Sequence, residues 1–246
     1  MDKTISKGSI SGRVAPPCSK SYAQRALAAS LLAEGESELY NLDLCDDTLS
    51  ALRTIEALGA TTERIDEHTV KILGGLSPRT DTLKVGESGL ATRMFTPIAS
   101  LCDTPITIQG EGTLMYRPMD MMIEPLRQLG VDIRDGGGRL PIEVCGKMKG
   151  GEIEVDASVS SQFLTGLLLA LPLVEEDTTI QVANAVSKPY LDMTIDMASR
   201  FGVRIEHNDY EEFFVEGGQH YTPCKVYETS GCGVLGHQGH KGTRRS

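Results

Sequence analysis

One structural pattern occurs three times along this chain, and this repetition limits the possible folds more than any other feature. Each copy contains an apolar helix, a strand, a second helix and a hairpin. The glycines that follow the second helices are spaced by 71 and 72 residues: Gly59, Gly130 and Gly202. The serines at the starts of the first helices are spaced by 67 and 73 residues: Ser21, Ser88 and Ser161. Two landmarks that recur together indicate three copies of one βαβαββ unit.

A period this long is typical of three units around a pseudo-threefold axis, and not of a thin solenoid. We therefore predict one α/β (α+β) domain at residues 14–227, with mixed sheets outside and helices packed together inside. The three units cover about residues 14–75, 82–146 and 152–217.

The predicted elements follow local start and stop signals. One or two short strands are expected within Lys3–Val14, before the first helix. Asp46 and Asp47 are expected to cap the second helix from outside. The other expected helices are Thr48–Leu58, Leu90–Leu101, a helix opened by Pro118 and ending at Leu129, Phe163–Val174, and a helix from Pro189 to Phe201.

Charge and composition exclude several classes of function. The formal net charge of −10 argues against a general nucleic-acid binder and against binding to anionic membranes. The longest apolar run, Phe163–Val174, is too short to span a bilayer, and no charged-then-apolar leader opens the chain, so a cytoplasmic location is expected. The six cysteines contain no CxxC pair, so we expect neither a metal site nor a disulfide framework.

The stretch Pro16–Gly35 suggests an anion site at a helix start. Lys20 and Arg25 lie in or near the first turn, where the helix dipole normally disfavours cations. A bound anion would explain them, because free backbone N–H groups also point outward there. Ser19 or Ser21 is placed to accept hydrogen bonds from those N–H groups. The alternative is that both cations simply point into solvent.

Threefold symmetry would bring the corresponding helix starts of all three units to one end of the domain. Residues at these starts are mostly hydroxyl, amide and basic: Ser19, Lys20, Ser21, Arg25, Glu87, Ser88, Gly89, Arg93, Ser160, Ser161 and Gln162. Arg117 and Lys188 each precede a proline expected to open a second helix; the alternative for each is a solvated cation beside a capped turn. Such a gathering favours binding of a phosphate or a carboxylate.

Several blocks of this sequence resemble those of the EPSP synthase (5-enolpyruvylshikimate-3-phosphate synthase) family. The blocks are SKSYAQRAL, GESGLATRM, RPMDMMIEPLRQLG, SVSSQFLTGLLLALP and SKPYLDMT, in the family's order, and the resemblance covers about Ile5 to Tyr227. It implies one domain of the two-domain enolpyruvyl transferase fold. It also implies transfer of an enolpyruvyl group from phosphoenolpyruvate to shikimate 3-phosphate, with no metal or organic cofactor.

The resemblance assigns ligand roles to matching positions. Shikimate 3-phosphate contacts are implied for Lys20, Ser21, Arg25, Ser160, Ser161, Gln162, Ser187 and Tyr190. Phosphoenolpyruvate contacts are implied for Lys20, Gly89, Arg117 and Gln162. The chain departs from the family's usual Asn-Ala-Gly-Thr loop at Glu87 and Leu90, which affects the expected fit of phosphoenolpyruvate and of glyphosate, which occupies the same subsite.

The ends of the chain also depart from the family pattern. Residues 1–13 would form a strand of the other domain, and the Gly-rich residues 228–246 have no counterpart in the family. A disordered tail is a stronger interpretation of His237 and His240 than a metal site. The acid and base residues would lie in a missing second domain. We therefore expect this chain to hold the shikimate 3-phosphate half-site and to be inactive alone. The missing domain would be its natural partner.

Two other functions remain open at this point. A related UDP-sugar enolpyruvyl transferase would need a reactive cysteine in a mobile Pro/Gly loop, and the nearest candidates, Cys18 and Cys145, lack that setting. The second alternative is a non-catalytic binding fragment, or one half of a split enzyme.

Overall fold

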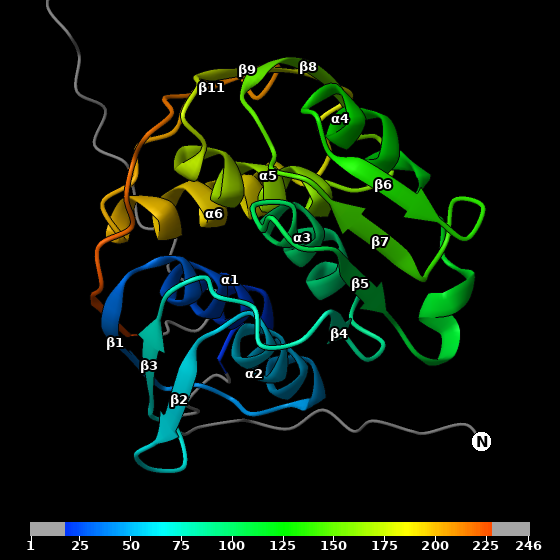
Figure 1. The fold of residues 1–246 in the computed structure, drawn as a ribbon. Helices are drawn as coiled ribbons and strands as arrows, with labels where there is room; N and C mark the ends of the chain where they lie inside the picture. Colours follow the sequence, from blue (N-terminus) through cyan, green and yellow to red (C-terminus); the bar gives the residue numbers. More distant parts are fainter. Residues whose placement is uncertain (1–17, 228–246) are drawn as a thin grey trace, which may run out of the picture.

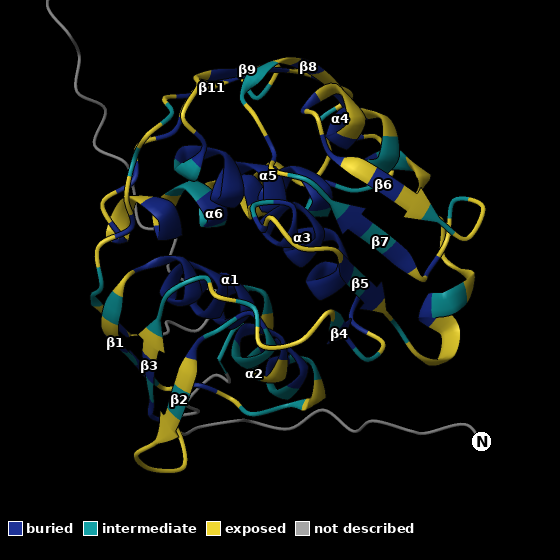
Figure 2. Cartoon of the chain, in the orientation of Figure 1, coloured by how far each residue is buried: buried dark blue, intermediate teal, exposed yellow. Residues whose placement is uncertain are grey.

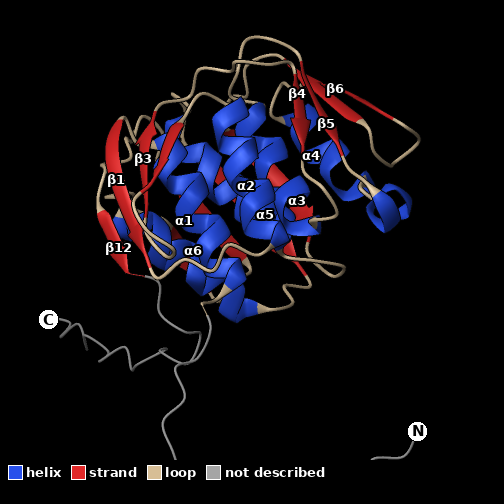
Figure 3. Ribbon diagram, turned by 90° about the horizontal axis from the view of Figure 1, so that it is seen from below, coloured by secondary structure: helices blue, strands red, loops and turns tan. Residues whose placement is uncertain are grey.

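The computed structural model describes residues 18–227 of the 246. Three four-stranded sheets surround a bundle of helices, with helices inside and mixed sheets outside (Figures 1 and 3). This arrangement confirms the predicted fold class. The strand expected within Lys3–Val14, the whole segment 1–13 and the tail 228–246 lie outside the described residues.

The three units have the same order of elements. The first contains α1 (Lys20–Leu32), β1 (Gly35–Tyr40), α2 (Asp46–Ala57), β2 (Thr61–Arg64) and β3 (Val70–Gly74). The second contains β4 (Thr82–Lys84), α3 (Gly89–Ala99), β5 (Ile106–Gln109), the 3-10 turns η1 (Gly112–Tyr116) and η2 (Asp120–Met122), α4 (Ile123–Gln128), β6 (Asp132–Asp135) and β7 (Ile142–Cys145). The third contains β8 (Gly151–Asp156), α5 (Gln162–Ala170), the 3-10 turn η3 (Leu171–Leu173), β9 (Thr178–Ala183), α6 (Lys188–Arg200), β10 (Glu206–Asn208) and β11 (Glu212–Val215).

The sheets share one topology, but the first is completed by a distant segment. In the second and third sheets, β4 and β8 pair in parallel with β5 and β9 of their own units. In the first sheet that place is taken by β12 (Lys225–Tyr227), which pairs in parallel with β1. The order is therefore β12-β1-β3-β2, equivalent to β4-β5-β7-β6 and β8-β9-β11-β10. The last described strand, β12, thus lies beside the first, β1, in one sheet.

The first helices of the units form the core (Figure 2). Every residue of α3 is buried, and α1 is buried from Tyr22 through Leu32. α3 and α5 pack closely because Gly166 has no side chain: a Cβ atom there would lie 2.7 Å from the carbonyl oxygen of Met94 and 2.8 Å from that of Arg93. A helix that is apolar on all sides fits this interior position.

Two local predictions were wrong. Pro118 does not open a helix: Arg117 is extended, Met119 is neither extended nor helical, and α4 begins only at Ile123. Tertiary hydrogen bonds hold this segment open, because Arg93 donates to Pro118 O and Met119 donates to Gly138 O.

The cap of the second helix was also placed wrongly. Asp46 and Asp47 lie inside the first turn of α2, and Cys45 is the N-cap. The two carboxylates there still stabilise the helix through its dipole. At α1, Ser19 is the N-cap, but its side chain makes no capping hydrogen bond.

Within residues 18–227, no helix is long and apolar enough to cross a bilayer.

Candidate anion-binding site

A pocket of about 620 Å³ lies where the starts of α1, α2, α3 and α5 meet. Five residues that the sequence assigned to the site line it: Lys20, Ser21, Gly89, Arg117 and Gln162. They come from all three units, so the symmetry brings together groups up to 142 positions apart, from Lys20 to Gln162. The positive ends of four helix dipoles converge here, which favours an anion.

Three acidic residues also line the pocket, and two of them are already engaged. Lys20 Nζ lies 2.6 Å from Asp47 Oδ2, and this hydrogen bond raises the pKa of Lys20 against the opposing effect of burial. Glu87 Oε2 accepts hydrogen bonds from the backbone N and Oγ1 of Thr113, both at 3.1 Å. Asp47 is thus bound to Lys20, and Glu87 to Thr113 in η1. Arg117, in contrast, forms no ion pair among the described residues.

Gly89 begins α3 between two guanidinium groups. A Cβ atom at Gly89 would lie 3.0 Å from Nη1 of Arg93 and 3.2 Å from Nη1 of Arg117. Ser88, the N-cap, accepts a hydrogen bond from the backbone N of Ala91 at 3.2 Å. The absent side chain leaves the helix start open to a ligand, and two cations flank it.

Arg25, which was predicted as a ligand contact, does not line the pocket and is fully buried. Nε donates to Thr194 Oγ1 at 2.9 Å, and Nη2 donates to Thr165 Oγ1 at 3.0 Å and to Tyr190 O at 3.2 Å. Nη1 donates to Ser21 O at 2.7 Å. Burial lowers the pKa of Arg25 to about 10, so the group stays charged at neutral pH. Arg25 therefore joins α1 to α5 and α6.

The remaining predicted contacts also lie outside the pocket lining. Ser160 Oγ accepts from the backbone N of Gln162 at 3.1 Å, and Ser161 is the buried N-cap of α5 without a side-chain capping bond. Ser187, the N-cap of α6, has a left-handed backbone with φ of 60°. The ring of Tyr190 is 47% exposed. Their ligand roles stay predictions.

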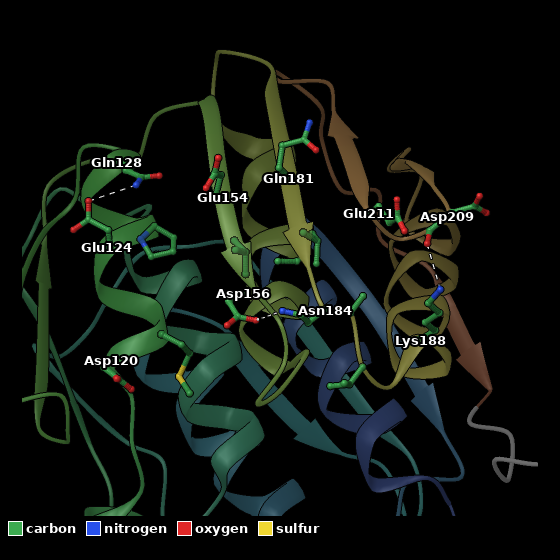
Figure 4. Close-up of a pocket in the computed structure, with 17 residues that line it drawn as sticks. Asp120, Glu124, Gln128, Glu154, Asp156, Gln181, Asn184, Lys188, Asp209 and Glu211 are labelled. Carbon is green, nitrogen blue, oxygen red and sulfur yellow. Dashed lines mark hydrogen bonds between the residues drawn. The ribbon is translucent and has the colours of Figure 1, made fainter.

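Lys188 does not converge on the anion pocket. It faces a larger cavity of about 1120 Å³ that α4 and the ends of β8 and β9 line (Figure 4). Its Nζ donates to Asp209 O at 3.4 Å and lies 5.0 Å from the centre of the Tyr210 ring. The other charged side chains of this cavity are all acidic: Asp120, Glu124, Glu154, Asp156, Asp209 and Glu211. This excess of carboxylates repels anions, so the smaller pocket is the candidate site.

Arg93 was expected near the site from its place at a helix start, but the resemblance gave it no ligand role. It is 7% exposed, and it bonds to Gln162 and to Pro118, which follows Arg117. The available signal in the sequence was the spacing of four residues between Gly89 and Arg93, because residues four apart are neighbours on the surface of a helix. Cys18 and Cys145 do not line the pocket, and residues 18–227 contain no group of three side chains suited to hold a metal ion.

Gly89→Ala is expected to weaken anion binding about tenfold while leaving stability nearly unchanged. The new methyl group would contact the flexible ends of Arg93, Arg117 and Gln162, and so would displace the two guanidinium groups that flank the helix start. Calorimetric titration with phosphoenolpyruvate and urea unfolding would measure both effects. Ser199→Ala, at an exposed position of α6 that does not line the pocket, is the control. Unchanged affinity in Gly89→Ala would place the ligand elsewhere.

Comparisons with known proteins agree with the motif blocks. A sequence profile described as EPSP synthase (3-phosphoshikimate 1-carboxyvinyltransferase) matches residues 5–229. A protein of that second name from Shewanella amazonensis is 40% identical over 228 residues, covering 88% of this chain and 53% of the relative. One from Clostridium novyi is 35% identical over 224 residues, covering 87% and 52%.

The fold agrees as well. A solved structure of EPSP synthase from Acinetobacter baumannii superposes with a TM-score of 0.79 at 24% identity, covering 89% of this chain and 50% of that one. The chain thus spans about half the length of the relatives it matches.

Proposed function

This chain belongs to the EPSP synthase family, and from that premise we propose that it carries the shikimate 3-phosphate half of the family's active site. One observation carries the proposal. The five lining residues that the motif blocks single out come from three separate units, yet they meet in one pocket at four helix starts. The reaction would be enolpyruvyl transfer from phosphoenolpyruvate to shikimate 3-phosphate.

The proposed substrates match the chemistry of the pocket. Both are anions with a phosphate and a carboxylate, and such groups need fixed N–H and cationic donors. In the proposal, Lys20, Arg117 and the N–H groups at Gly89 hold phosphoenolpyruvate. Ser21, Ser160, Ser161, Ser187 and Tyr190 contact shikimate 3-phosphate, with Arg25 bracing their helices and Gln162 between the two ligands.

The proposed substrates would need acid and base groups for proton transfer. The pocket offers Asp46, Asp47 and Glu87, of which Asp47 holds Lys20 and Glu87 holds Thr113. We therefore assign the acid and base roles to the half of the relatives that this chain does not span, on the same polypeptide or on another. Residues 1–246 alone are expected to release no phosphate from the two substrates, and full turnover by them would contradict this assignment.

Calorimetric titration with shikimate 3-phosphate tests the proposal directly. We expect saturable binding by the chain, and at least tenfold weaker binding by Ser161→Ala. Ser161 is a suitable probe because its side chain makes no capping hydrogen bond to α5, so its removal should cost little stability. The matched control is Ser199→Ala, which changes an exposed serine near the C-terminal end of α6.

The outcomes separate the alternatives. Binding lost in Ser161→Ala but kept in Ser199→Ala supports a preformed half-site. Equal binding by both variants would contradict the assigned residues. An absence of binding at millimolar ligand would mean that the chain alone holds no preformed site.

A further inference from the structure

Arg93 is a buried cation without an acidic partner. It lies on α3 and is 7% exposed, and no carboxylate of the described residues forms an ion pair with it. Its hydrogen bonds all go to neutral oxygens: Gln162 Oε1 at 3.0 Å, Pro118 O at 3.2 Å and Gly89 O at 3.4 Å. Its Nε has no hydrogen-bond partner.

Such a residue is costly to keep in a folded protein. Removing a charge from water without pairing it is unfavourable, and an unsatisfied N–H adds to that cost. Burial, together with the nearby Arg117 guanidinium, lowers the pKa of Arg93 below its usual value. Arg93 therefore detracts from stability as it stands, which points to a role toward a ligand of opposite charge.

Arg93 fixes which end of the Gln162 amide faces the pocket. A guanidinium only donates hydrogen bonds, so only the amide oxygen can face it. Since Nη1 of Arg93 donates to Oε1 of Gln162, the reversed orientation would place two donors against each other. The amide NH2 group is thus the end left toward the pocket that Gln162 lines.

Arg93 also restrains the segment that carries Arg117. Its Nη2 donates to the carbonyl oxygen of Pro118, directly after Arg117. The Nη1 atoms of both arginines lie close to the open side of Gly89, as their distances of 3.0 and 3.2 Å from its Cβ position show. One buried side chain therefore contacts both Gln162 and the segment that carries Arg117, two of the pocket-lining residues.

We propose that Arg93 is a positioning residue that makes this wall of the pocket a donor-only surface, by orienting the Gln162 amide and holding the Arg117 segment. This inference rests on the proposed function, and it concerns the phosphoenolpyruvate part of the site. The wall then suits a fully ionised phosphate or carboxylate, which only accepts hydrogen bonds. A ligand that must donate hydrogen bonds there finds no acceptor on Gln162.

The first test needs no ligand. Gln162→Glu places a carboxylate beside Arg93, so we expect it to raise the urea midpoint of the chain. In the Arg93→Met background the same change leaves a half-buried carboxylate without that partner, and we expect the midpoint to fall. Arg134→Met, which removes an arginine that is 75% exposed on β6, is the charge-matched control background, where Gln162→Glu should still stabilise. The same sign with and without Arg93 would overturn the inference.

The second test uses calorimetric titration with phosphoenolpyruvate. Arg93→Met and Gln162→Ala should each weaken binding about tenfold, and the double variant should lose no more than either single variant, because one acts through the other. Arg93→Lys should recover part of the affinity. Affinity within twofold of the wild type in Arg93→Met, or losses that multiply in the double variant, would overturn the inference. If the wild-type chain itself binds no phosphoenolpyruvate, the proposed phosphoenolpyruvate contacts fail for this chain, while titration with shikimate 3-phosphate still tests the half-site and the sign of the Gln162→Glu effect still decides the role of Arg93.

Discussion

Gly166→Ala is expected to destabilise the domain by about 2 kcal/mol, even though alanine favours a helix by about 1 kcal/mol over glycine. The methyl group would lie 2.7 and 2.8 Å from the carbonyl oxygens of Met94 and Arg93, where only movement of the whole α3 backbone relieves the contact. Gly166→Val is expected to cost about 4 kcal/mol or more, which is comparable with the total stability of many domains.

Urea unfolding followed by far-ultraviolet circular dichroism measures both variants. Gly89→Ala is the matched control, because its added methyl contacts only the flexible ends of side chains, those of Arg93, Arg117 and Gln162, and no backbone atom. The control should keep a midpoint close to that of the wild type. A Gly166→Ala midpoint equal to or above the wild-type value would show that α3 and α5 can separate at little cost, contrary to their packing.

Arg25→Ala is expected to lower stability by about 3 kcal/mol and to abolish measurable binding of shikimate 3-phosphate. The change removes three hydrogen bonds that join α1 to α5 and α6, and a fourth to Ser21 O within α1, and it leaves a cavity beside Thr165 and Thr194. Tyr190 loses both a hydrogen bond to its carbonyl and a cation–π contact of 5.9 Å.

Arg25→Met separates packing from polar positioning. Methionine fills much of the same volume and removes a desolvated charge, so stability should return to within about 1 kcal/mol of the wild type. Binding should stay lost, because no N–H group holds Ser21 and Tyr190 in place. Calorimetry on both variants, with urea midpoints in parallel, provides the measurement. Recovery of binding together with stability in Arg25→Met would reduce Arg25 to a packing residue.

Local signals were sufficient to predict the fold class and the meeting of the helix starts. The three glycines after the second helices and the three serines at the first helices mark turns whose geometry is set by neighbouring residues alone. Once they show a threefold repeat, symmetry places Lys20, Gly89 and Gln162 at one end without further information.

The errors arose where distant contacts override local preference. Pro118 is a good first residue of a helix, but its carbonyl accepts from Arg93, 25 positions earlier, and α4 begins only at Ile123. Lys188 has a favourable sequence position beside Pro189, yet the acidic cavity and Tyr210 attract it away from the pocket. The burial of Arg25 was not anticipated, because it depends on Thr165 and Thr194, which no local pattern connects to it, and its ligand role stays a prediction.

The pairing of β12 with β1 has a consequence for the synthesis of the protein. Tyr40 at the end of β1 and Lys225 at the start of β12 are 185 residues apart in the chain. At about 5–20 residues per second, a ribosome needs roughly ten to forty seconds to cover that distance. During this interval β1 cannot pair with β12, so the nascent first sheet has an edge open to strands of other chains. The first unit to be translated is therefore among the last to be completed.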